Sequence, residues 1–164
     1  MRIAVIDSSC LINLTHLGLA VAVSQFFHLI YVPRSVHQEV NRKSRFRYKL
    51  KKLYRTRVYK RCQVADEVRV KWLADQLDPG EAEALIQAKE RKAAYFLGDE
   101  RRAREVGELM GIQPVGTARL LARLHLDGLA GEPRLLVNKL RKDLGCRIAE
   151  EVIDEAITRS RETI

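Results

Sequence analysis

Short apolar runs alternate with helical patterns along the chain, and this alternation limits the fold more than any other feature. Four runs are typical of strands buried on both faces, because they lack the polar alternation of a half-exposed strand. They lie at residues 3–6, 29–32, 94–97 and 112–115. Helical patterns separate them, at residues 10–14, 17–27, 36–40, 82–92, 103–110 and 117–126. Strands that alternate with helices predict a parallel sheet covered by helices, which is an α/β fold.

The rest of the chain contains a short strand or turn and a helical pair. We expect the strand or turn at residues 68–73, and the two helices at 135–144 and 148–157. Gly145 lies between these helices as a cap or turn. The length of 164 residues and the hydrophobic fraction of 46% fit a single domain with its own core.

The sequence favours a cytoplasmic protein that does not contact a membrane. No apolar run is long enough to cross a bilayer, and the acid Asp7 comes too early for a signal peptide. The three cysteines include no CxxC pair, and the four histidines have no metal-ligand spacing. We therefore expect neither a disulfide framework nor a zinc site.

The positive charge of the chain is concentrated in one segment, residues 42–61, which we call the basic block. The chain has a formal net charge of +9, with 30 basic and 21 acidic residues, and 11 of the basic ones lie in the basic block. Subtracting these 11 leaves 19 basic residues against 21 acidic ones, because the block contains no acid. Such a segregated cluster is expected of a protein with a polyanionic partner.

We expect the basic block to be an exposed helix or helical hairpin inserted into the domain. Four aromatic residues lie among its charges: Phe46, Tyr48, Tyr54 and Tyr59. Basic side chains neutralise phosphates, and exposed aromatic rings stack on unpaired bases, so the block is a candidate RNA-binding surface. Its candidate residues are Arg42, Lys43, Arg45, Arg47, Lys49, Lys51, Lys52, Arg55, Arg57, Lys60 and Arg61. A solvated helix face, or a docking surface for an acidic protein, are the alternatives.

Four acids, Asp7, Glu39, Glu81 and Asp99, share a position just after a strand or in the first turns of a helix. Parallel sheets gather their functional loops at this edge. Each acid alone could instead cap a helix. We expect capping to explain Glu81 in part, through the sequence Asp78-Pro79-Gly80-Glu81. It explains Asp7 and Glu39 poorly, since Glu39 lies beyond the cap that we predict at Ser35.

Carboxylates that converge at one edge repel each other and therefore either raise their pKa values or bind a cation. With oxygen ligands alone, the expected ion is Mg²⁺ or Mn²⁺. Such a site suits the hydrolysis of phosphodiester bonds. Ser8 and Ser9 are candidates to orient a metal-bound water or a phosphate, with helix capping as their alternative role.

Four ordered segments resemble a PIN domain. They are IDSSCLI at 6–12, VPRSVHQEV at 32–40, DPGEAEA at 78–84 and LGDERRAR at 97–104. The Gly116-Thr117 segment and the terminal helical pair are similar to one prokaryotic branch of that family, so the resemblance covers nearly the whole chain. It implies a three-layer fold with a central parallel sheet, and a metal-dependent ribonuclease that is often the toxin of a toxin–antitoxin pair.

The resemblance also assigns the acids. Asp7, Glu39, Glu81 and Asp99 match the catalytic, metal-binding positions, with Glu83 an alternative to Glu81 and Glu100 an alternative to Asp99. Two features depart from the family pattern. Glu81 stands where Asp is more common and is one methylene longer, and the basic block is unusually rich in charge.

The sequence thus predicts a metal-dependent endoribonuclease whose partners are RNA and an antitoxin protein. The alternatives are a catalytically inactive RNA-binding or regulatory module, and a nuclease that acts on DNA. We also expect that the terminal helices could form a homodimer.

Overall fold

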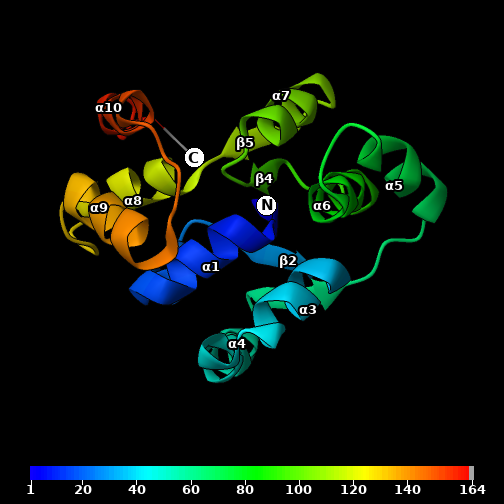
Figure 1. The fold of residues 1–164 in the computed structure, drawn as a ribbon, viewed down its shortest axis with the longest axis horizontal. Coiled ribbons are helices and arrows are strands. Elements are labelled where there is room, and N and C mark those ends of the chain that lie inside the picture. The colour runs from blue at the N-terminus through cyan, green and yellow to red at the C-terminus, as the bar shows by residue number, and fades with distance from the viewer. Residues whose placement is uncertain (163–164) are drawn as a thin grey trace.

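The computed structural model describes residues 1–162, and a sheet of five parallel strands lies at its centre (Figure 1). The strands are β1 (Ile3–Ile6), β2 (Leu29–Pro33), β3 (Tyr59–Cys62), β4 (Tyr95–Leu97) and β5 (Gln113–Val115). Their spatial order is β3-β2-β1-β4-β5, and every neighbouring pair is parallel. The predicted α/β class with a central parallel sheet is confirmed.

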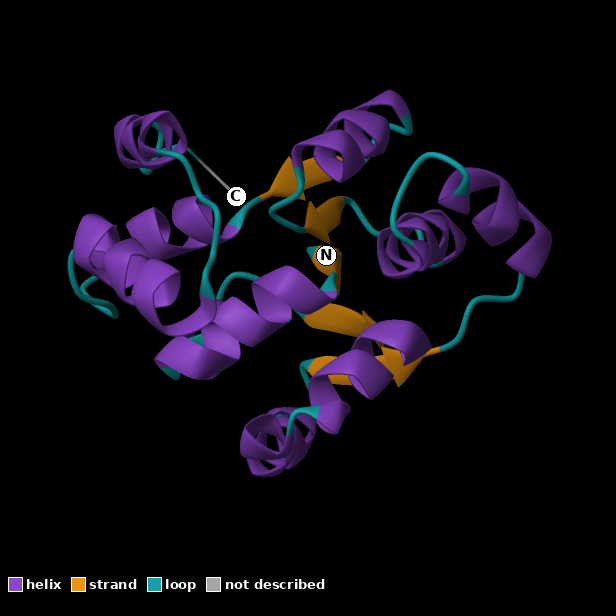
Figure 2. Cartoon of the chain, in the orientation of Figure 1, coloured by secondary structure: helices purple, strands orange, loops and turns teal. Residues whose placement is uncertain are grey.

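Ten helices of the described chain connect or follow these strands (Figure 2). They are α1 (Ser8–Leu17), α2 (Ala20–Val23), α3 (Arg34–Arg42), α4 (Ser44–Arg55), α5 (Glu67–Ala74), α6 (Pro79–Glu90), α7 (Arg101–Leu109), α8 (Thr117–Leu126), α9 (Pro133–Leu144) and α10 (Glu150–Thr158). In Figure 1, α1, α8 and α9 lie on one side of the strands, and α5 and α6 lie on the other. The molecule therefore has the three layers that the resemblance implies. In the described residues, no helix is long and apolar enough to cross a membrane.

The core has two parts, one on each face of the sheet. Successive strand residues point to opposite faces. Ala4 and Ile6 accordingly pack with α1, α8 and α9, whereas Val5 and Phe96 pack with α6 and α7. Burial on both faces explains why these strands are apolar throughout.

The basic block contains a helix with an exposed charged side, as predicted, but it is not all helical. It supplies the end of α3, the helix α4 and then the edge strand β3. Phe46, Leu50 and Leu53 on α4 are buried in the core, so the helix is packed along one side. Strand β3 escaped prediction because two of its four residues, Lys60 and Arg61, are exposed charges.

Two other local predictions are wrong. Residues 68–73 belong to helix α5, not to a strand or turn, and Asp66 caps this helix by accepting a hydrogen bond from the backbone N–H of Arg69. The helix expected at residues 17–27 is interrupted after α1 at Gly18, whose φ of 74° is in the left-handed region that glycine adopts readily. Only the short helix α2 follows.

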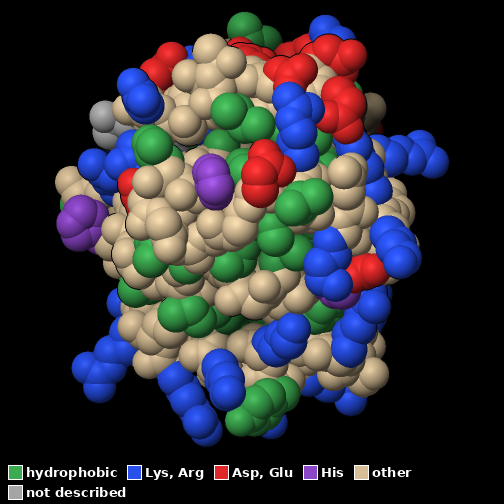
Figure 3. Space-filling model, turned by 90° about the vertical axis from the view of Figure 1, so that its left-hand side faces the viewer, with side chains coloured by type: hydrophobic (Ala, Val, Ile, Leu, Met, Phe, Trp, Pro, Cys, Tyr) green, Lys and Arg blue, Asp and Glu red, His purple; other side chains and the backbone are tan. Residues whose placement is uncertain are grey.

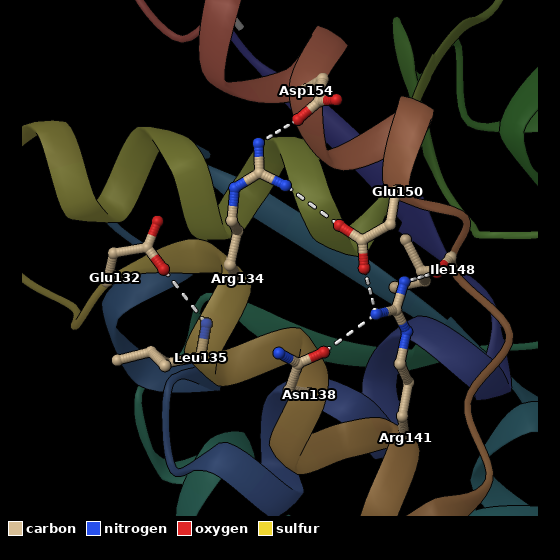
Figure 4. A network of polar contacts seen from close by, with 8 residues as sticks. All are labelled: Glu132, Arg134, Leu135, Asn138, Arg141, Ile148, Glu150 and Asp154. Atoms are coloured by element: carbon tan, nitrogen blue, oxygen red, sulfur yellow. Dashed lines mark hydrogen bonds and ion pairs between the residues drawn. The ribbon is translucent and has the colours of Figure 1, made fainter.

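The C-terminal helical pair is present as predicted, with Gly145 as the left-handed cap of α9. Two arginines of α9 join this helix to α10 and the segment before it (Figure 4). Arg134 bonds to Glu150 at 3.0 Å and also to Asp154, and Arg141 bonds to Glu150 and to the carbonyl oxygen of Ile148. These contacts link α10 to α9.

Candidate active site

The strand order reverses between β1 and β4, which is where open α/β sheets place their ligand sites. The backbone continues this pairing beyond the strands, because the N–H of Asp7 donates to the carbonyl oxygen of Leu97 at 2.9 Å. Asp7 therefore follows β1 directly beside the Gly98-Asp99 turn that follows β4. The topology brings together two acids that are 92 residues apart in the chain.

Asp7 is a buried N-cap. Its side chain is 3% exposed, and its Oδ1 accepts a hydrogen bond from the backbone N–H of Cys10 at 2.8 Å. The hydroxyl of Ser9 donates to both carboxylate oxygens, at 3.1 and 3.0 Å. Our expectation that capping explains Asp7 poorly is therefore wrong, because Asp7 caps α1. Ser9 orients this carboxylate, and Ser8 lines the cleft next to it.

Asp99 is held by three donors from two other elements. Its Oδ1 accepts from the backbone N–H of Thr117 at 2.6 Å. Its Oδ2 accepts from the hydroxyl of Thr117 at 2.6 Å and from the side-chain amide of Asn13 at 3.0 Å. Both partners are buried. The position of this carboxylate is therefore fixed by α1 and by the start of α8.

The carboxylates of Asp7 and Asp99 form a pair that no salt bridge compensates. Neither Asp7 nor Asp99 forms a salt bridge with any residue in the range 1–162. Burial raises the pKa of Asp7 well above its ordinary value, and the charges of Asp99 and Glu81 raise it further. The hydrogen bonds from Cys10 and Ser9 offset only part of this effect. Asp7 is thus an acid whose ionised form needs a positive partner.

Two glycines leave room for this arrangement. A Cβ atom at Gly98 would lie 2.5 Å from the ring of Phe96 and 2.9 Å from Oδ2 of Asp7. A Cβ atom at Gly116 would lie 3.2 Å from Oδ1 of Asp99. The close approach of the turns after β1, β4 and β5 therefore depends on the absence of a side chain at position 98.

The other predicted acids do not share the buried environment of Asp7. Glu81 completes a capping box by accepting from the backbone N–H of Asp78 at 3.2 Å, and burial raises its pKa, as do Glu100 and Asp78. The charge of Glu81 also raises the pKa of Asp7. Glu39 and Glu100 are exposed on the wall of the cleft.

Glu83 lies beside the start of α3 and does not line the large cleft. It accepts from the backbone N–H of Ser35 at 3.2 Å and so caps the start of α3. The predicted capping role of Ser35 is wrong, because α3 begins at Arg34 and the Ser35 hydroxyl finds no partner among the described residues. Glu83 lines a small separate pocket with Ser35, away from the acid pair.

The donor set fits a hydrated Mg²⁺ or Mn²⁺ better than a fully caged ion. Within residues 1–162 no group of three or more His, Cys, Asp or Glu side chains is arranged to hold a metal. Mg²⁺, however, commonly binds through one or two carboxylates and keeps several waters. Asp7 and Asp99 supply hard oxygen ligands, and the raised pKa of Asp7 shows that its charged form lacks stabilisation, so this pair suits such an ion.

A cleft of about 1080 Å³ opens beside the acid pair, and Asp99 of this pair lines it. Its lining includes Ser8, Asn13 and Asp99 on the floor, with α7 and α10 along one side and the junction of α3 and α4 on the other. Lys43 and Arg45 belong to that junction, so the basic block reaches the cleft. The cleft is large enough for a chain-like ligand to lie beside the carboxylates.

The basic block forms a surface of uncompensated charge around α4. All eleven of its Lys and Arg residues are exposed, and none forms a salt bridge within the described part of the chain. Basic side chains are spread over the lower part of the face in Figure 3, whereas acidic side chains gather toward its top. Figure 1 places α4 at the lower end and α10 at the upper end.

The aromatic residues of the basic block do not form the stacking surface that we predicted. Phe46 and Tyr59 are 1% exposed, and the hydroxyl of Tyr59 donates to the carbonyl oxygen of Ala20 at 2.7 Å. Tyr54 is half-buried and bonds to His37. Only Tyr48, at 66% exposure, is available to stack on a base.

Sequence reasoning missed two residues of the site, Asn13 and Thr117. Asn13 is a polar residue in the apolar run Cys10-Leu11-Ile12-Asn13-Leu14, and such a residue is buried only with a partner. That irregularity could have marked it as functional. In the sequence, Thr117 looks like an ordinary residue at the start of a helix. No pattern in the neighbouring residues predicts its contact with Asp99.

Comparison with known families matches residues 3–162 to the model of the DUF3368 family, which is described as a PIN domain. No curated protein and no solved structure matches the chain.

Proposed function

The chain belongs to the PIN-domain family, and on this premise we propose that it is a divalent-metal-dependent endoribonuclease that hydrolyses RNA phosphodiester bonds. PIN domains are generally nucleases, and they generally use divalent metal ions. One observation carries the proposal for this chain: the buried carboxylate of Asp7 lies beside Asp99, neither acid forms a salt bridge among the described residues, and Asp99 lines an open cleft. A site of this kind favours a hard cation and, with it, an anionic substrate.

Asp7 and Asp99 would hold the ion, and the residues around them would keep both carboxylates in place. Ser9 and the backbone of Cys10 fix Asp7, whereas Asn13 and Thr117 fix Asp99. When bound, a divalent cation supplies charge stabilisation for the phosphoryl group and lowers the pKa of an attacking water.

The further ligands remain proposals. We retain Glu39 because it lines the same cleft, and Glu81 because its charge raises the pKa of Asp7. Glu100 is the next candidate, since it also lines the cleft and its charge raises the pKa of Glu81. Glu83 is the weakest candidate, because it caps α3 instead.

The basic block would bind the RNA strand. Lys43 and Arg45 lie at the edge of the cleft, and the other basic side chains extend from there along α4 and β3. Exposed cations without acidic partners release counterions when they bind phosphates, so RNA affinity should fall steeply with salt. Neutralising Lys49, Lys51 and Lys52 together should reduce the slope of log K against log salt by about 2, at about 0.7 per lost single-strand contact.

The decisive experiment is cleavage of RNA in Mn²⁺ by the native protein and three variants. Asp7→Asn and Asp99→Asn should each abolish cleavage while the circular dichroism spectrum is unchanged. Asp75→Asn is the matched control, because Asp75 is exposed at the end of α5 and undergoes the same chemical change. Full cleavage by Asp7→Asn would refute the proposal, and competition between RNA and DNA substrates identifies the preferred nucleic acid.

One observation favours a second candidate, an RNA-binding or regulatory module without catalysis. The described residues contain no ready-made site with three or more ligands, so the acid pair could serve a fold that no longer cleaves. In that case RNA would bind with the same affinity in EDTA and in Mn²⁺, and no preparation would cleave it.

A toxin role, in the cytoplasm and with an antitoxin as inhibitor, is a finer form of the nuclease proposal. The basic block would then serve an acidic antitoxin segment as well as RNA, since both are polyanions. Expression of the native chain should stop bacterial growth, whereas Asp7→Asn should not. A homodimer through α9 and α10 stays a prediction, to be measured by sedimentation.

A further inference from the structure

Arg104 on α7 is a half-buried cation without a partner among the described residues. Its Nε atom is shielded from solvent and has no hydrogen-bond acceptor among the described residues. The guanidinium also forms no salt bridge within residues 1–162, although the neighbouring residues Glu105 and Glu108 are acidic. A guanidinium presents five N–H donors in a fixed plane, and a buried donor without an acceptor is costly.

The other arginines nearby differ from Arg104. Arg101 bonds to Glu105 at 2.8 Å, and Arg102 contacts both Glu105 and Gln76. Arg119 also has a buried Nε without an acceptor, but its Nη2 pairs with Glu162 at 3.3 Å. Among these arginines only Arg104 keeps its whole guanidinium free for a ligand.

Arg104 lies at the acid pair. A Cβ atom at Gly116 would be 3.6 Å from Nη1 of Arg104 and 3.2 Å from Oδ1 of Asp99, so the guanidinium and the carboxylate border the same glycine. Arg104 and Asp99 both line the large cleft. The missing side chain at position 116 therefore keeps a space open between a free cation and an acid that we propose as a metal ligand.

We propose that Arg104 binds the phosphate of the RNA strand beside Asp99, with its two Nη atoms donating to the two nonbridging oxygens. A phosphodiester matches the planar pair of donors of a guanidinium and would give an acceptor to a cation that has none among the described residues. The ion held by Asp7 and Asp99 and the guanidinium of Arg104 would then approach one phosphate from two sides. This inference rests on the proposed function for the identity of the ligand as RNA.

The test compares two variants of α7 that lose the same charge. Binding of a fluorescent single-stranded RNA is measured in EDTA, without cleavage, over a range of salt concentrations. Arg104→Gln should weaken binding by about tenfold, as expected when a charged hydrogen bond is lost. It should also lower the slope of log K against log salt by about 0.7, which corresponds to one phosphate contact. Arg102→Gln is the control, because Arg102 is exposed and does not line the cleft.

Equal affinities and slopes for Arg104→Gln and Arg102→Gln would overturn the inference. Arg104→Lys provides a second test that does not depend on the folding of the Gln variant. It keeps the positive charge but loses the planar pair of N–H donors. We therefore expect weaker binding with the same slope of log K against log salt as the native protein. Native affinity in Arg104→Lys would also overturn the inference.

These results separate the inference from the proposed function. If Arg104→Gln weakens binding in EDTA but no preparation cleaves RNA in Mn²⁺, the phosphate site stands and the nuclease proposal fails. If Asp7→Asn abolishes cleavage while Arg104→Gln binds and cleaves as Arg102→Gln does, the nuclease proposal stands and this inference fails.

Discussion

Asp7→Asn should make the metal-free protein more stable at neutral pH, even though it removes a residue of the proposed site. The native carboxylate is 3% exposed, lies beside Asp99 and has no cationic partner. Asparagine is nearly isosteric, and it caps helices as well as aspartate does. The variant therefore keeps the hydrogen bond from the N–H of Cys10 and loses only the unfavourable charge.

The magnitude follows from two separable contributions. Each unit by which a pKa is raised in the folded state corresponds to about 1.4 kcal/mol of lost stability once the group is ionised. Asp7→Ala removes the charge and also the cap, which is worth about 1 kcal/mol. Asp7→Asn should therefore melt about 2–4 °C above Asp7→Ala in a protein of this size. It should also melt above the native protein in EDTA.

The pH dependence gives the sign of the effect. Below the pKa of about 3.9 that aspartate has in an unfolded chain, Asp7 is protonated in both the folded and the unfolded state, so its charge does not change the stability of the native protein. As the pH rises from there through the raised folded pKa, the folded state binds more protons than the unfolded state. The stability of the native protein then falls while that of Asp7→Asn does not, and the difference becomes constant above the folded pKa.

Thermal unfolding in EDTA from pH 4 to pH 8 measures this difference. Adding Mn²⁺ at pH 7.5 should stabilise the native protein but not Asp7→Asn, because only the native site binds the ion. A variant that is less stable than the native protein in EDTA at pH 7.5, with a pH-independent difference, would refute the reasoning.

Three further predictions concern packing and support of the site. Gly98→Ala forces a Cβ atom to 2.5 Å from the Phe96 ring and should lower the free energy of unfolding, measured in urea, by about 1–3 kcal/mol. A variant as stable as the native protein would contradict this packing. Thr117→Val removes the hydroxyl that donates to Asp99 and should lower the free energy of unfolding by about 1–3 kcal/mol, whereas Thr117→Ser keeps a hydroxyl and should lose much less. Equal losses in the two variants would mean that only the packing of Thr117 matters. Leu50→Ala, in the buried side of α4, should cost about 2–5 kcal/mol, and a negligible loss would mean that α4 is detached.

Much of the fold could be predicted because its signals are local. The apolar run of β1 and the acid after it indicate a buried strand that ends at a functional edge, and the structure has both. The capping box at Asp78 is equally local and is present. Strand β3 was missed because it lies at an edge, where exposed charges replace the apolar pattern.

The support of the site could not be predicted, because it depends on contacts between distant segments. Asn13 reaches Asp99 across 86 residues, and Glu83 caps the start of α3 through the backbone N–H of Ser35, 48 residues earlier in the chain. A sequence pattern shows that Glu83 is at a helix start but does not show which helix start it serves. The same limit applies to the aromatic rings, since periodicity on α4 did not distinguish buried Phe46 from exposed Tyr48.

The two edges of the sheet also bear on how this chain avoids aggregation. Exposed strand edges can pair with other molecules, and charged residues or proline at the edge prevent this. On β3 the exposed charged residues Lys60 and Arg61 have this role. On β5, the N–H of Gln113 points toward β4 and donates to the carbonyl oxygen of Ala94. The next backbone nitrogen, that of Pro114, therefore faces outward. It carries no hydrogen and cannot donate to another strand. Variants that neutralise the basic block through β3 should therefore lose solubility as well as RNA affinity, whereas variants confined to α4 should lose affinity alone.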